Sequence, residues 1–424
     1  MREAERRAPP MRIVLVVPSF PKLSETFIVN QFLGLLELGC DVHIHCDRWD
    51  ATAAAKFRQL AGRRDWQRRV HVTWPSRPQV WAALLAPFAL LHCLFRNPRA
   101  TARYVRHAYG APRFQGWKQL YLDARLLSLR PQVVHFEFGS LAATRMELKE
   151  LLGCKLVVSF RGYDLNFVGL DKPAHYEAVW RRADVLHFLG NDLWRRAQRR
   201  GCPAEASHVL IPPAIDTRYF EPDRRPAGVR VGSPQRPLRL LSVGRLEWKK
   251  GYEYVMQAVK LLKEQGVHCE YRIVGDGEYR ACLAFARRQL GLEFDVELLR
   301  NRASDQVKRE MEWADVLVHG AVSEGFCNAV LEAQSMALPV VCTDADGLAE
   351  NVADSETGFV VARRNHQAMA ERLKELAENP ALRQRMGRAG RDRVTQRFQL
   401  PQQIQAFAKA YRQLSSANGA QHHR

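Results

Sequence analysis

The segment LSVGRLEWKKGYEYVMQAV (residues 241–259) contains, in order, the end of an apolar strand, a glycine-containing basic turn and an amphipathic helix. The short apolar run before Gly244 is typical of a buried strand, whereas the apolar residues after Gly251 recur with the spacing of one helix face. A strand that passes through a short turn into a helix is the repeating unit of a parallel α/β sheet. This segment therefore predicts an α/β fold.

Short apolar runs alternate with helix-length segments along the rest of the chain. The first half contains six such runs: RIVLVVPSF (12–20), DVHIHC (41–46), QVVHFEF (132–138), KLVVSF (155–160), VLHFLG (185–190) and HVLIPPAI (208–215). The second half contains five: LRLLSVGR (238–245), CEYRIVG (269–275), DVELLR (295–300), ADVLVHG (314–320) and PVVCTDA (339–345). Because near-continuous apolar strands separated by helices favour parallel sheets covered on both faces, we expect doubly wound α/β domains.

The 424 residues predict more than one domain, because single cores usually stop growing at about 250–300 residues. The stretch EPDRRPAGVRVGSPQRP (221–237) has four prolines and two glycines and interrupts the alternation, so it is the predicted linker. We therefore expect the following organisation: an extension (1–10), an N-terminal Rossmann-like domain (11–220), the linker, a C-terminal Rossmann-like domain (238–395), and a final helix with a tail (396–424). The final helix is expected to pack on the N-terminal domain.

The charge balance is strongly basic, with 64 Lys and Arg against 45 Asp and Glu and a formal net charge of +19. Such a surplus favours acidic partners but does not choose between nucleic acid, anionic lipid and phosphorylated substrates. The nine cysteines contain no CxxC pair, so we expect neither disulfides nor a zinc site. The N-terminus lacks the apolar core of a secretory signal. The apolar run VWAALLAPFALLHCLF (80–95) is interrupted by proline and is interpreted as a buried or interfacial helix rather than a spanning one.

Two cations follow the strand of the opening segment. Arg245 and Lys250 lie at its carboxyl end, where ligands bind in open α/β sheets, and together they could neutralise a diphosphate. A solvated basic turn is the alternative, and the segment alone does not decide between them.

Two glutamates in SEGFCNAVLEAQSMALPVVCTDADGLAENV (323–352) flank a predicted helix start near Cys327–Asn328. Free backbone N–H groups at a helix start form an anion site, and carboxylates accept hydrogen bonds from hydroxyl groups. Glu324, which precedes the helix, is therefore a candidate to bind a hydroxyl of a sugar. Glu332, which lies inside the helix, is a candidate to bind the diol of a ribose. For an arbitrary pair of glutamates, two solvated side chains would be the simpler interpretation.

Five motifs of the second half closely resemble the donor domain of the retaining glycosyltransferases of family four: GRLEWKKG (244–251), VGDGE (274–278), EGFCNAVLEAQSMALPVV (324–341), DGLAENV (346–352) and SETGFVV (355–361). Four motifs of the first half resemble the subgroup that builds exopolysaccharides such as colanic acid and amylovoran: FPKLSETFIVNQFLGLLELGCDV (20–42), VVHFEFG (133–139), SFRGYDL (159–165) and IPPAIDTRYF (211–220). The resemblance spans roughly residues 11–415. It implies the GT-B fold, in which two Rossmann-like domains face each other across a cleft.

The resemblance also implies roles for individual residues. Arg245 and Lys250 match the family's diphosphate-binding pair, Glu324 matches the glutamate that contacts the transferred sugar, and Glu332 matches the one that holds the ribose. The backbone around the helix start would contact phosphate or sugar, at Gly325, Phe326, Cys327 and Asn328. The implied reaction is a hexosyl transfer with retention, without metal or cofactor, in which Glu324, Arg245 and Lys250 act as the catalytic electrostatic stabilisers.

The chain departs from the family's pattern on the acceptor or sugar side. Arg161 and Glu137 each stand where a histidine is usual, and Asp346 stands where glycine is common, whereas Asp164 and His135 occupy their usual places. A guanidinium near the donor would suit a uronic acid, but pairing of Arg161 with Glu137 is the favoured interpretation. For His135, in an apolar strand, a packed histidine is favoured over a catalyst.

The expected function is transfer of a sugar from a nucleotide-diphosphate sugar to a growing, lipid-linked oligosaccharide of a cell-surface or exopolysaccharide. The expected location is cytoplasmic and peripheral on the inner face of the plasma membrane. Basic clusters at 96–107 and 181–200 are candidates to face anionic lipid. A GT-B epimerase and a non-catalytic scaffold are the alternatives within this fold. A nucleic-acid-binding protein is suggested by charge alone, without a recognition motif, so nucleic acid is not an expected partner.

Overall fold

The computed structural model describes residues 11–22, 25–57, 59–61, 65–75, 79–112, 114–223 and 229–419. These residues form two compact units. The first contains the chain up to Phe188, Trp194–Ile211 and the residues from Ile404 onward, and the second contains Leu189–Leu193 and Pro212–Gln403.

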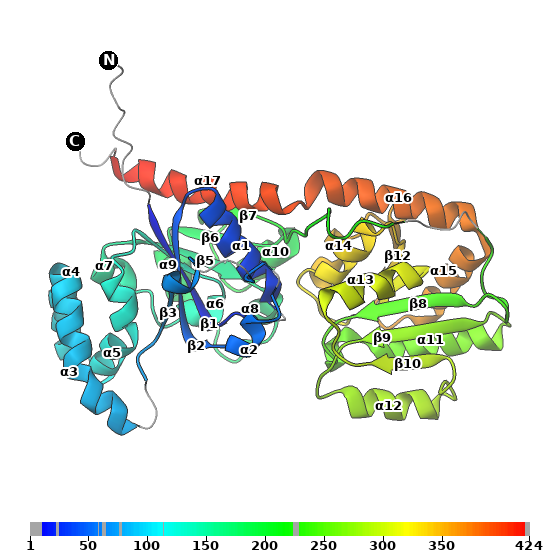
Figure 1. The fold of residues 1–424 in the computed structure, drawn as a ribbon, viewed down its shortest axis with the longest axis horizontal. Coiled ribbons are helices and arrows are strands. Elements are labelled where there is room, and N and C mark those ends of the chain that lie inside the picture. Colours follow the sequence, from blue (N-terminus) through cyan, green and yellow to red (C-terminus); the bar gives the residue numbers. More distant parts are fainter. Residues whose placement is uncertain are drawn as a thin grey trace, which may run out of the picture. The chain divides into compact units, whose positions relative to one another are not determined.

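A seven-stranded parallel sheet forms the centre of the first unit, with the strand order β3-β2-β1-β4-β5-β6-β7 (Figure 1). Its strands are β1 (Arg12–Phe20), β2 (Asp41–Trp49), β3 (Val70–Val72), β4 (Val133–Phe136), β5 (Lys155–Phe160), β6 (Val185–Phe188) and β7 (His208–Leu210). Strands β4 and β6 are buried along their whole length. Such strands need cover on both faces, so their apolar runs select a doubly wound fold.

Helices α1 (Thr26–Glu37) and α17 (Leu400–Gly419) supply part of this cover. From Ile404 onward, α17 packs with α1 in the core of the first unit, through Phe407, Ala408, Tyr411 and Leu414. Gly34 of α1 lies against Ile404, where a Cβ would come within 2.0 Å of the isoleucine side chain. The shorter helices of this unit are α2 (Ala51–Ala54), α6 (Gly139–Ala142), α7 (Leu148–Leu152), α8 (Gly162–Asn166) and α9 (Glu177–Arg182), and α10 (Asn191–Arg199) follows β6.

Three longer helices precede β4 and pack mainly on one another. They are α3 (Gln79–Arg96), α4 (Pro98–Gly110) and α5 (Gln115–Ser128). The predicted helix at 80–95 is thus present, but it is not a core helix, because only 11% of its apolar window is buried. It is also long and apolar enough, by length and composition, to cross a membrane.

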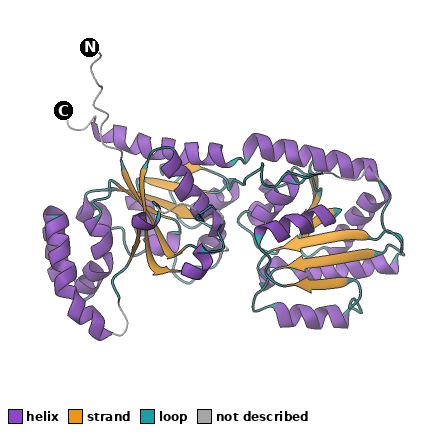
Figure 2. Cartoon of the chain, in the orientation of Figure 1, coloured by secondary structure: helices purple, strands orange, loops and turns teal. Residues whose placement is uncertain are grey.

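The second unit contains a six-stranded parallel sheet with the order β10-β9-β8-β11-β12-β13. Figure 2 draws the strands in orange and the helices in purple. Its strands are β8 (Leu238–Val243), β9 (Cys269–Val274), β10 (Val296–Leu299), β11 (Val316–His319), β12 (Val340–Thr343) and β13 (Gly358–Val361). This is the order of a Rossmann sheet, in which the connections reverse direction between β8 and β11. The prediction of two doubly wound, Rossmann-like units is confirmed by the two sheets.

Helices cover both faces of the second sheet, and successive strand residues serve the two faces. Leu240 packs in the core formed with α11 and α15, whereas Leu241 packs in the core formed with α13 and α14. The helices are α11 (Tyr252–Glu264), α12 (Arg280–Gln289), α13 (Ser304–Trp313), α14 (Asn328–Ser335), α15 (His366–Glu378) and α16 (Pro380–Arg397).

The structure differs from the expected organisation between the two sheets. Residues 212–220, expected in the first domain, group with the second unit. Of the predicted linker, 224–228 lies outside the described residues, while Val231 is buried in the core of the second unit. Strand β7 ends at Leu210, because the prolines that follow lack the N–H that a ladder needs. The short strand β3 and the strand β13 are absent from the predicted strands, although SETGFVV contains β13.

Candidate functional site

The loops after β8 and β11 meet at the point where the second sheet reverses direction, which is where open α/β sheets bind ligands. The Lys249 carbonyl accepts a 2.8 Å hydrogen bond from the N–H of Val322. Gly251 has a φ of 60°, and a Cβ there would lie 2.0 Å from the Gly320 carbonyl oxygen. Only glycine permits this approach at a positive φ, so the two loops are held together through their backbones.

A largely buried ion pair joins these loops. The Lys250 ammonium contacts the Glu324 carboxylate, and the two side chains are only 12% and 15% exposed. Burial acts to lower the pKa of Lys250, but the charge of Glu324 reverses this effect and raises it. Burial would raise the pKa of Glu324, yet Lys250 and His319 lower it to about 2. Both groups are therefore charged at neutral pH.

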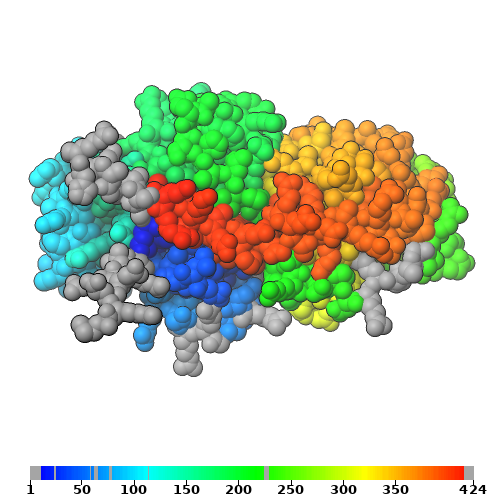
Figure 3. Space-filling view, turned by 90° about the horizontal axis from the view of Figure 1, so that it is seen from above, coloured from blue at the N-terminus to red at the C-terminus, as the bar shows by residue number. Residues whose placement is uncertain are grey.

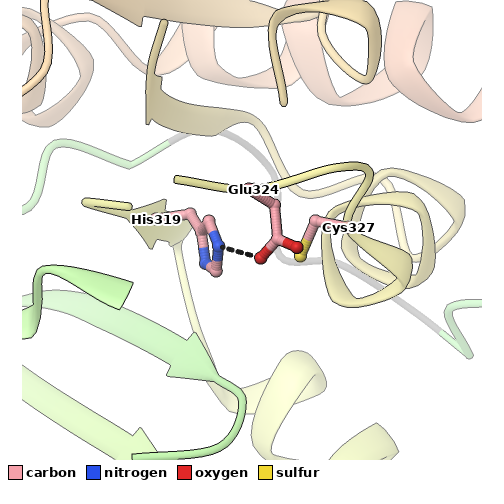
Figure 4. Close-up of side chains that lie close together, drawn as sticks. All are labelled: His319, Glu324 and Cys327. Carbon is pink, nitrogen blue, oxygen red and sulfur yellow. Dashed lines mark hydrogen bonds and ion pairs between the residues drawn. The ribbon is translucent and has the colours of Figure 1, made fainter. Parts of the chain in front are cut away.

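His319, the last residue of β11, forms a second cationic contact with the same carboxylate. Its Nε2 lies 3.4 Å from Glu324 Oε2, and its side chain is buried (Figure 4). Burial favours the neutral ring, but Cys327 and Glu324 raise its pKa to about 9. Sequence reasoning missed His319, whose signal is its place at the end of a strand, five residues before Glu324.

His319, Glu324 and Cys327 are also a possible set of metal ligands, since their ligand atoms lie within 4.8 Å of one another. A metal ion would need the neutral imidazole and a free carboxylate. The ammonium of Lys250, which contacts the Glu324 carboxylate, opposes the second condition. The residues present therefore fit a carboxylate held by two protein cations better than a resident metal.

Arg245 lies outside this buried cluster. Its side chain is 60% exposed, and its Nη1 lies 2.7 Å from Glu247 Oε1. Its backbone carbonyl accepts a 3.1 Å hydrogen bond from the hydroxyl of Tyr252 at the start of α11. The structure thus brings Lys250 and Glu324 into contact and places the guanidinium of Arg245 at the solvent-exposed side of the same turn.

Helix α14 begins at Asn328, with Cys327 as its N-cap, which confirms the predicted helix start. Asn351 fixes this start, because its amide accepts from the Cys327 N–H at 3.1 Å and donates to the Cys327 carbonyl at 2.9 Å. The cap supplies no side-chain hydrogen bond, so the first amides of the helix keep their capacity for an anion. Asn351 was not singled out from the sequence.

The turn after β12 fixes the backbone of the segment that carries Glu324. The Gly347 N–H donates to the Glu324 carbonyl at 3.0 Å, and a Cβ at Gly347 would lie 1.9 Å from the Gly325 carbonyl oxygen. Asp346, which departs from the family's glycine, has a φ of 54° and accepts a 2.7 Å hydrogen bond from the Ser323 hydroxyl. Arg363 contacts Asp346 at 3.2 Å. Neither Gly347 nor Arg363 was predicted as part of the site.

Glu332 lies further along α14 and is half-buried. Burial raises its pKa to about 7. Within the described part of the chain, no side-chain hydrogen bond involves its carboxyl group. A half-buried carboxyl without a protein partner is suited to hydroxyl groups of a ligand. Of the other candidates, Phe326 turns its ring toward Phe398, with 5.9 Å between the ring centroids.

In the first unit, Glu137 and Arg161 form a pair at the ends of β4 and β5. Arg161 Nη2 lies 2.7 Å from Glu137 Oε2, and the guanidinium lies over the ring of Phe27, 4.3 Å from its centroid. The Glu137 side chain is fully buried. Burial raises the pKa of Glu137, and Arg161 opposes that rise. The predicted pairing of Arg161 with Glu137 is confirmed, and the guanidinium of Arg161 is therefore paired with a carboxylate of the protein itself.

Asp164 and His135 have structural partners. Asp164 accepts hydrogen bonds of 2.9 Å from the N–H groups of Ser140 and Arg161, which fixes the start of α8. His135 is fully buried and bonds to Tyr411 and Ser159 at 2.6 and 2.7 Å, and burial lowers its pKa to about 3. The interpretation of His135 as a packed histidine is confirmed.

Comparison with known proteins identifies the family. The family described as "Glycosyl transferases group 1" matches residues 226–393. The chain is 31% identical to the putative colanic acid biosynthesis glycosyltransferase WcaL of Escherichia coli, over 86% of this chain and 90% of that protein. The chain belongs to the group 1 glycosyltransferases. This glycosyltransferase is also 29% identical to the amylovoran biosynthesis glycosyltransferase AmsK of Erwinia amylovora, over 88% of this chain and 92% of that protein.

Two solved structures share the fold of this glycosyltransferase. Anabaena HepE, solved with UDP and glucose, has a TM-score of 0.69 at 16% identity and covers 95% of this chain and 100% of its own. Sucrose-phosphate synthase from Thermosynechococcus elongatus has a TM-score of 0.71 at 16% identity and covers 96% of this chain and 100% of its own. The predicted GT-B fold is confirmed.

Proposed function

We propose that this glycosyltransferase moves a hexose, with retention of configuration, from a nucleotide-diphosphate sugar to a growing lipid-linked oligosaccharide of an exopolysaccharide. The observation that carries the proposal is the Lys250–Glu324 pair beside the uncapped start of α14, at the reversal point of the second sheet. The named activities of WcaL and AmsK support an exopolysaccharide product. HepE, which binds UDP and UDP-glucose in its solved structures, supports the donor class.

The charges of the cluster suit a diphosphate. Lys250 and His319 place two basic groups beside the single carboxylate of Glu324, so the charge of that carboxylate is compensated within the protein. The amides of α14 add partial positive charge, and Arg245 adds an exposed guanidinium. These groups would stabilise the negative charge that develops on the departing diphosphate.

The two glutamates would hold the ends of the donor. Glu324, charged at neutral pH, would accept from hydroxyls of the transferred sugar, and Glu332 would accept from the ribose diol. The backbone of Gly325, Phe326, Cys327 and Asn328 lies between them. Because Lys250 and the imidazolium of His319 supply the positive charge, the proposed reaction needs neither metal nor cofactor.

The proposed location is the cytoplasmic face of the plasma membrane, where a lipid-linked acceptor is reached. The basic stretches at 96–107 and 181–200 support contact with anionic lipid. Partners are therefore the nucleotide sugar, the lipid-linked acceptor and the membrane surface, and no nucleic acid.

The proposal is tested by a thermal-shift screen of nucleotide sugars, followed by transfer assays with the stabilising donor. A ligand at 100 times its Kd stabilises the native state by about 2.7 kcal/mol, which is a readily measured shift. We expect one nucleotide sugar to stabilise the protein, and product to form only when a lipid-linked acceptor is added. Conversion of the donor without acceptor would instead establish an epimerase. Failure of every nucleotide sugar to bind would refute the proposal.

A further inference from the structure

Helix α3 presents an apolar face that the described residues of the first unit leave uncovered. Its exposed apolar side chains recur with helical spacing and include two rings that are 64% and 84% exposed, those of Phe88 and Phe95. The seven large side chains of this face, called here the α3 face, are Val80, Trp81, Leu84, Phe88, Leu91, Leu94 and Phe95. Figure 3 shows α3 and α4, in blue-cyan to cyan, as part of the molecular surface. Soluble proteins rarely expose so much contiguous apolar area without a partner.

The opposite face of α3 is fixed to the protein. Ala89 and Cys93 are buried, and the Cys93 thiol lies 3.3 Å from the Ala124 carbonyl of α5. At the end of the helix, the Asn97 amide donates to the Leu127 carbonyl at 3.1 Å. A spanning orientation would break this packing, so the structure favours a helix that lies along an apolar surface.

The charges beside the α3 face indicate what that surface is. From Gln79 to Gly110 the sequence contains no aspartate or glutamate. Arg96, Arg99 and Arg106 are exposed at the end of α3 and along α4. An apolar face bordered by arginine and without carboxylates is complementary to a bilayer with anionic headgroups.

We infer that the α3 face inserts into the interfacial region of an anionic membrane, with the arginines of α3 and α4 on the lipid headgroups. The inference rests on the proposed function in one respect, because a lipid-linked acceptor explains why the enzyme should dock there. Membrane binding by the α3 face therefore has an apolar contribution besides the electrostatic one, since its aromatic and leucine side chains enter the boundary between headgroups and acyl chains.

Vesicle co-sedimentation of the full chain tests this inference. We expect binding to phosphatidylcholine vesicles that contain phosphatidylglycerol and weaker binding to phosphatidylcholine alone. The triple variant Leu84→Ser, Phe88→Ser, Leu91→Ser should lower the partition coefficient by about tenfold or more, because it removes three inserting side chains. Arg96→Glu with Arg99→Glu should reduce binding only to the anionic vesicles.

The matched control is Phe285→Ser with Phe294→Ser, which removes two exposed rings (65% and 101% exposed) from the second unit. This control should bind vesicles as the wild type does. Equal loss in the control and the triple variant, or no loss in the triple variant, would overturn the inference. Dimerisation of the wild type that the triple variant abolishes, without vesicle binding by either, would assign the α3 face to a second copy and also overturn it.

A further measurement separates this inference from the proposed function. Donor binding and transfer to a detergent-dispersed acceptor should be unchanged in the triple variant, which also shows that the variant folds. If the wild type transfers sugar but binds no vesicles, the docking inference fails and the function stands. If it binds vesicles through α3 but transfers no sugar, the function fails and the docking stands.

Discussion

Replacement of Lys250 by methionine removes one cation from a buried carboxylate while keeping most of the side-chain volume. Breaking a fully buried ion pair by removing one partner costs about 3–5 kcal/mol. The side chains here are 12% and 15% exposed, and His319 remains 3.4 Å from Glu324, so part of the charge stays compensated. We therefore expect Lys250→Met to lower the free energy of unfolding by about 1–3 kcal/mol.

Donor binding should decrease as well. A hydrogen bond to a charged group contributes about 1.5–3 kcal/mol, which corresponds to about a ten- to hundredfold weaker Kd for the nucleoside diphosphate. Chemical denaturation measures the stability, and calorimetric titration measures the Kd. The control is Lys263→Met, which removes the same charge from an exposed pair with Asp295.

The reasoning is refuted if Lys250→Met and Lys263→Met have equal effects on the Kd. A second test uses the double variant Lys250→Met, Glu324→Gln. Because it also removes the uncompensated carboxylate, it should unfold at a higher denaturant concentration than Lys250→Met alone. Equal or lower stability of the double variant would contradict the assigned charge state of Glu324.

Three further predictions concern the other titratable groups. The pKa of His319 is raised to about 9. Its stabilising contribution is therefore complete below the unfolded pKa of about 6.5 and is lost as pH rises through the folded value. The variant His319→Gln should show no such loss of stability or of donor affinity across that pH range, and a pH profile equal to that of the wild type would contradict the assignment. The pKa of Glu332 is raised to about 7. The free energy of unfolding therefore decreases as pH rises from about 4.3 through that value. The variant Glu332→Gln should abolish this decrease in thermal melts and should weaken donor binding, and normal donor binding by the variant would exclude the ribose role. Arg161→Ala should lower the free energy of unfolding by about 3–5 kcal/mol, because it removes the guanidinium from the buried Glu137 carboxylate and leaves His135, 3.4 Å away, whose pKa burial lowers. Arg161→Ala with Glu137→Gln should recover part of this loss in denaturant titrations, and no recovery would show that the pair is not the source.

The alternation of apolar strands and helices predicts every strand of both sheets except β3 and β13, because strands buried on both faces are recognisable from composition alone. The start of α14 was predictable for a similar reason, since Gly325 interrupts the chain just before a helical pattern. Strand β7 is shorter than the apolar run predicts, because Pro212 and Pro213 lack the N–H that would continue the ladder.

The interior of the site was less predictable. His319 contacts Glu324 because the loop between them reverses direction. The spacing of apolar residues does not predict such a reversal. The side-chain amide of Asn351 and the backbone N–H of Gly347 bond to the backbone of residues more than twenty positions away, which sequence patterns do not show. The exposure of α3 was equally hidden, since an apolar run is compatible with a buried helix until its neighbours are known.

The central claim is that the Lys250–Glu324 cluster binds the diphosphate of a nucleotide sugar without a metal. Calorimetric titration of the wild type with UDP, GDP and ADP, in the presence and absence of a chelator, tests it most directly. The account predicts saturable binding of at least one nucleoside diphosphate that the chelator does not change and that Lys250→Met weakens. Binding that requires a divalent cation, or that Lys250→Met leaves intact, would contradict it.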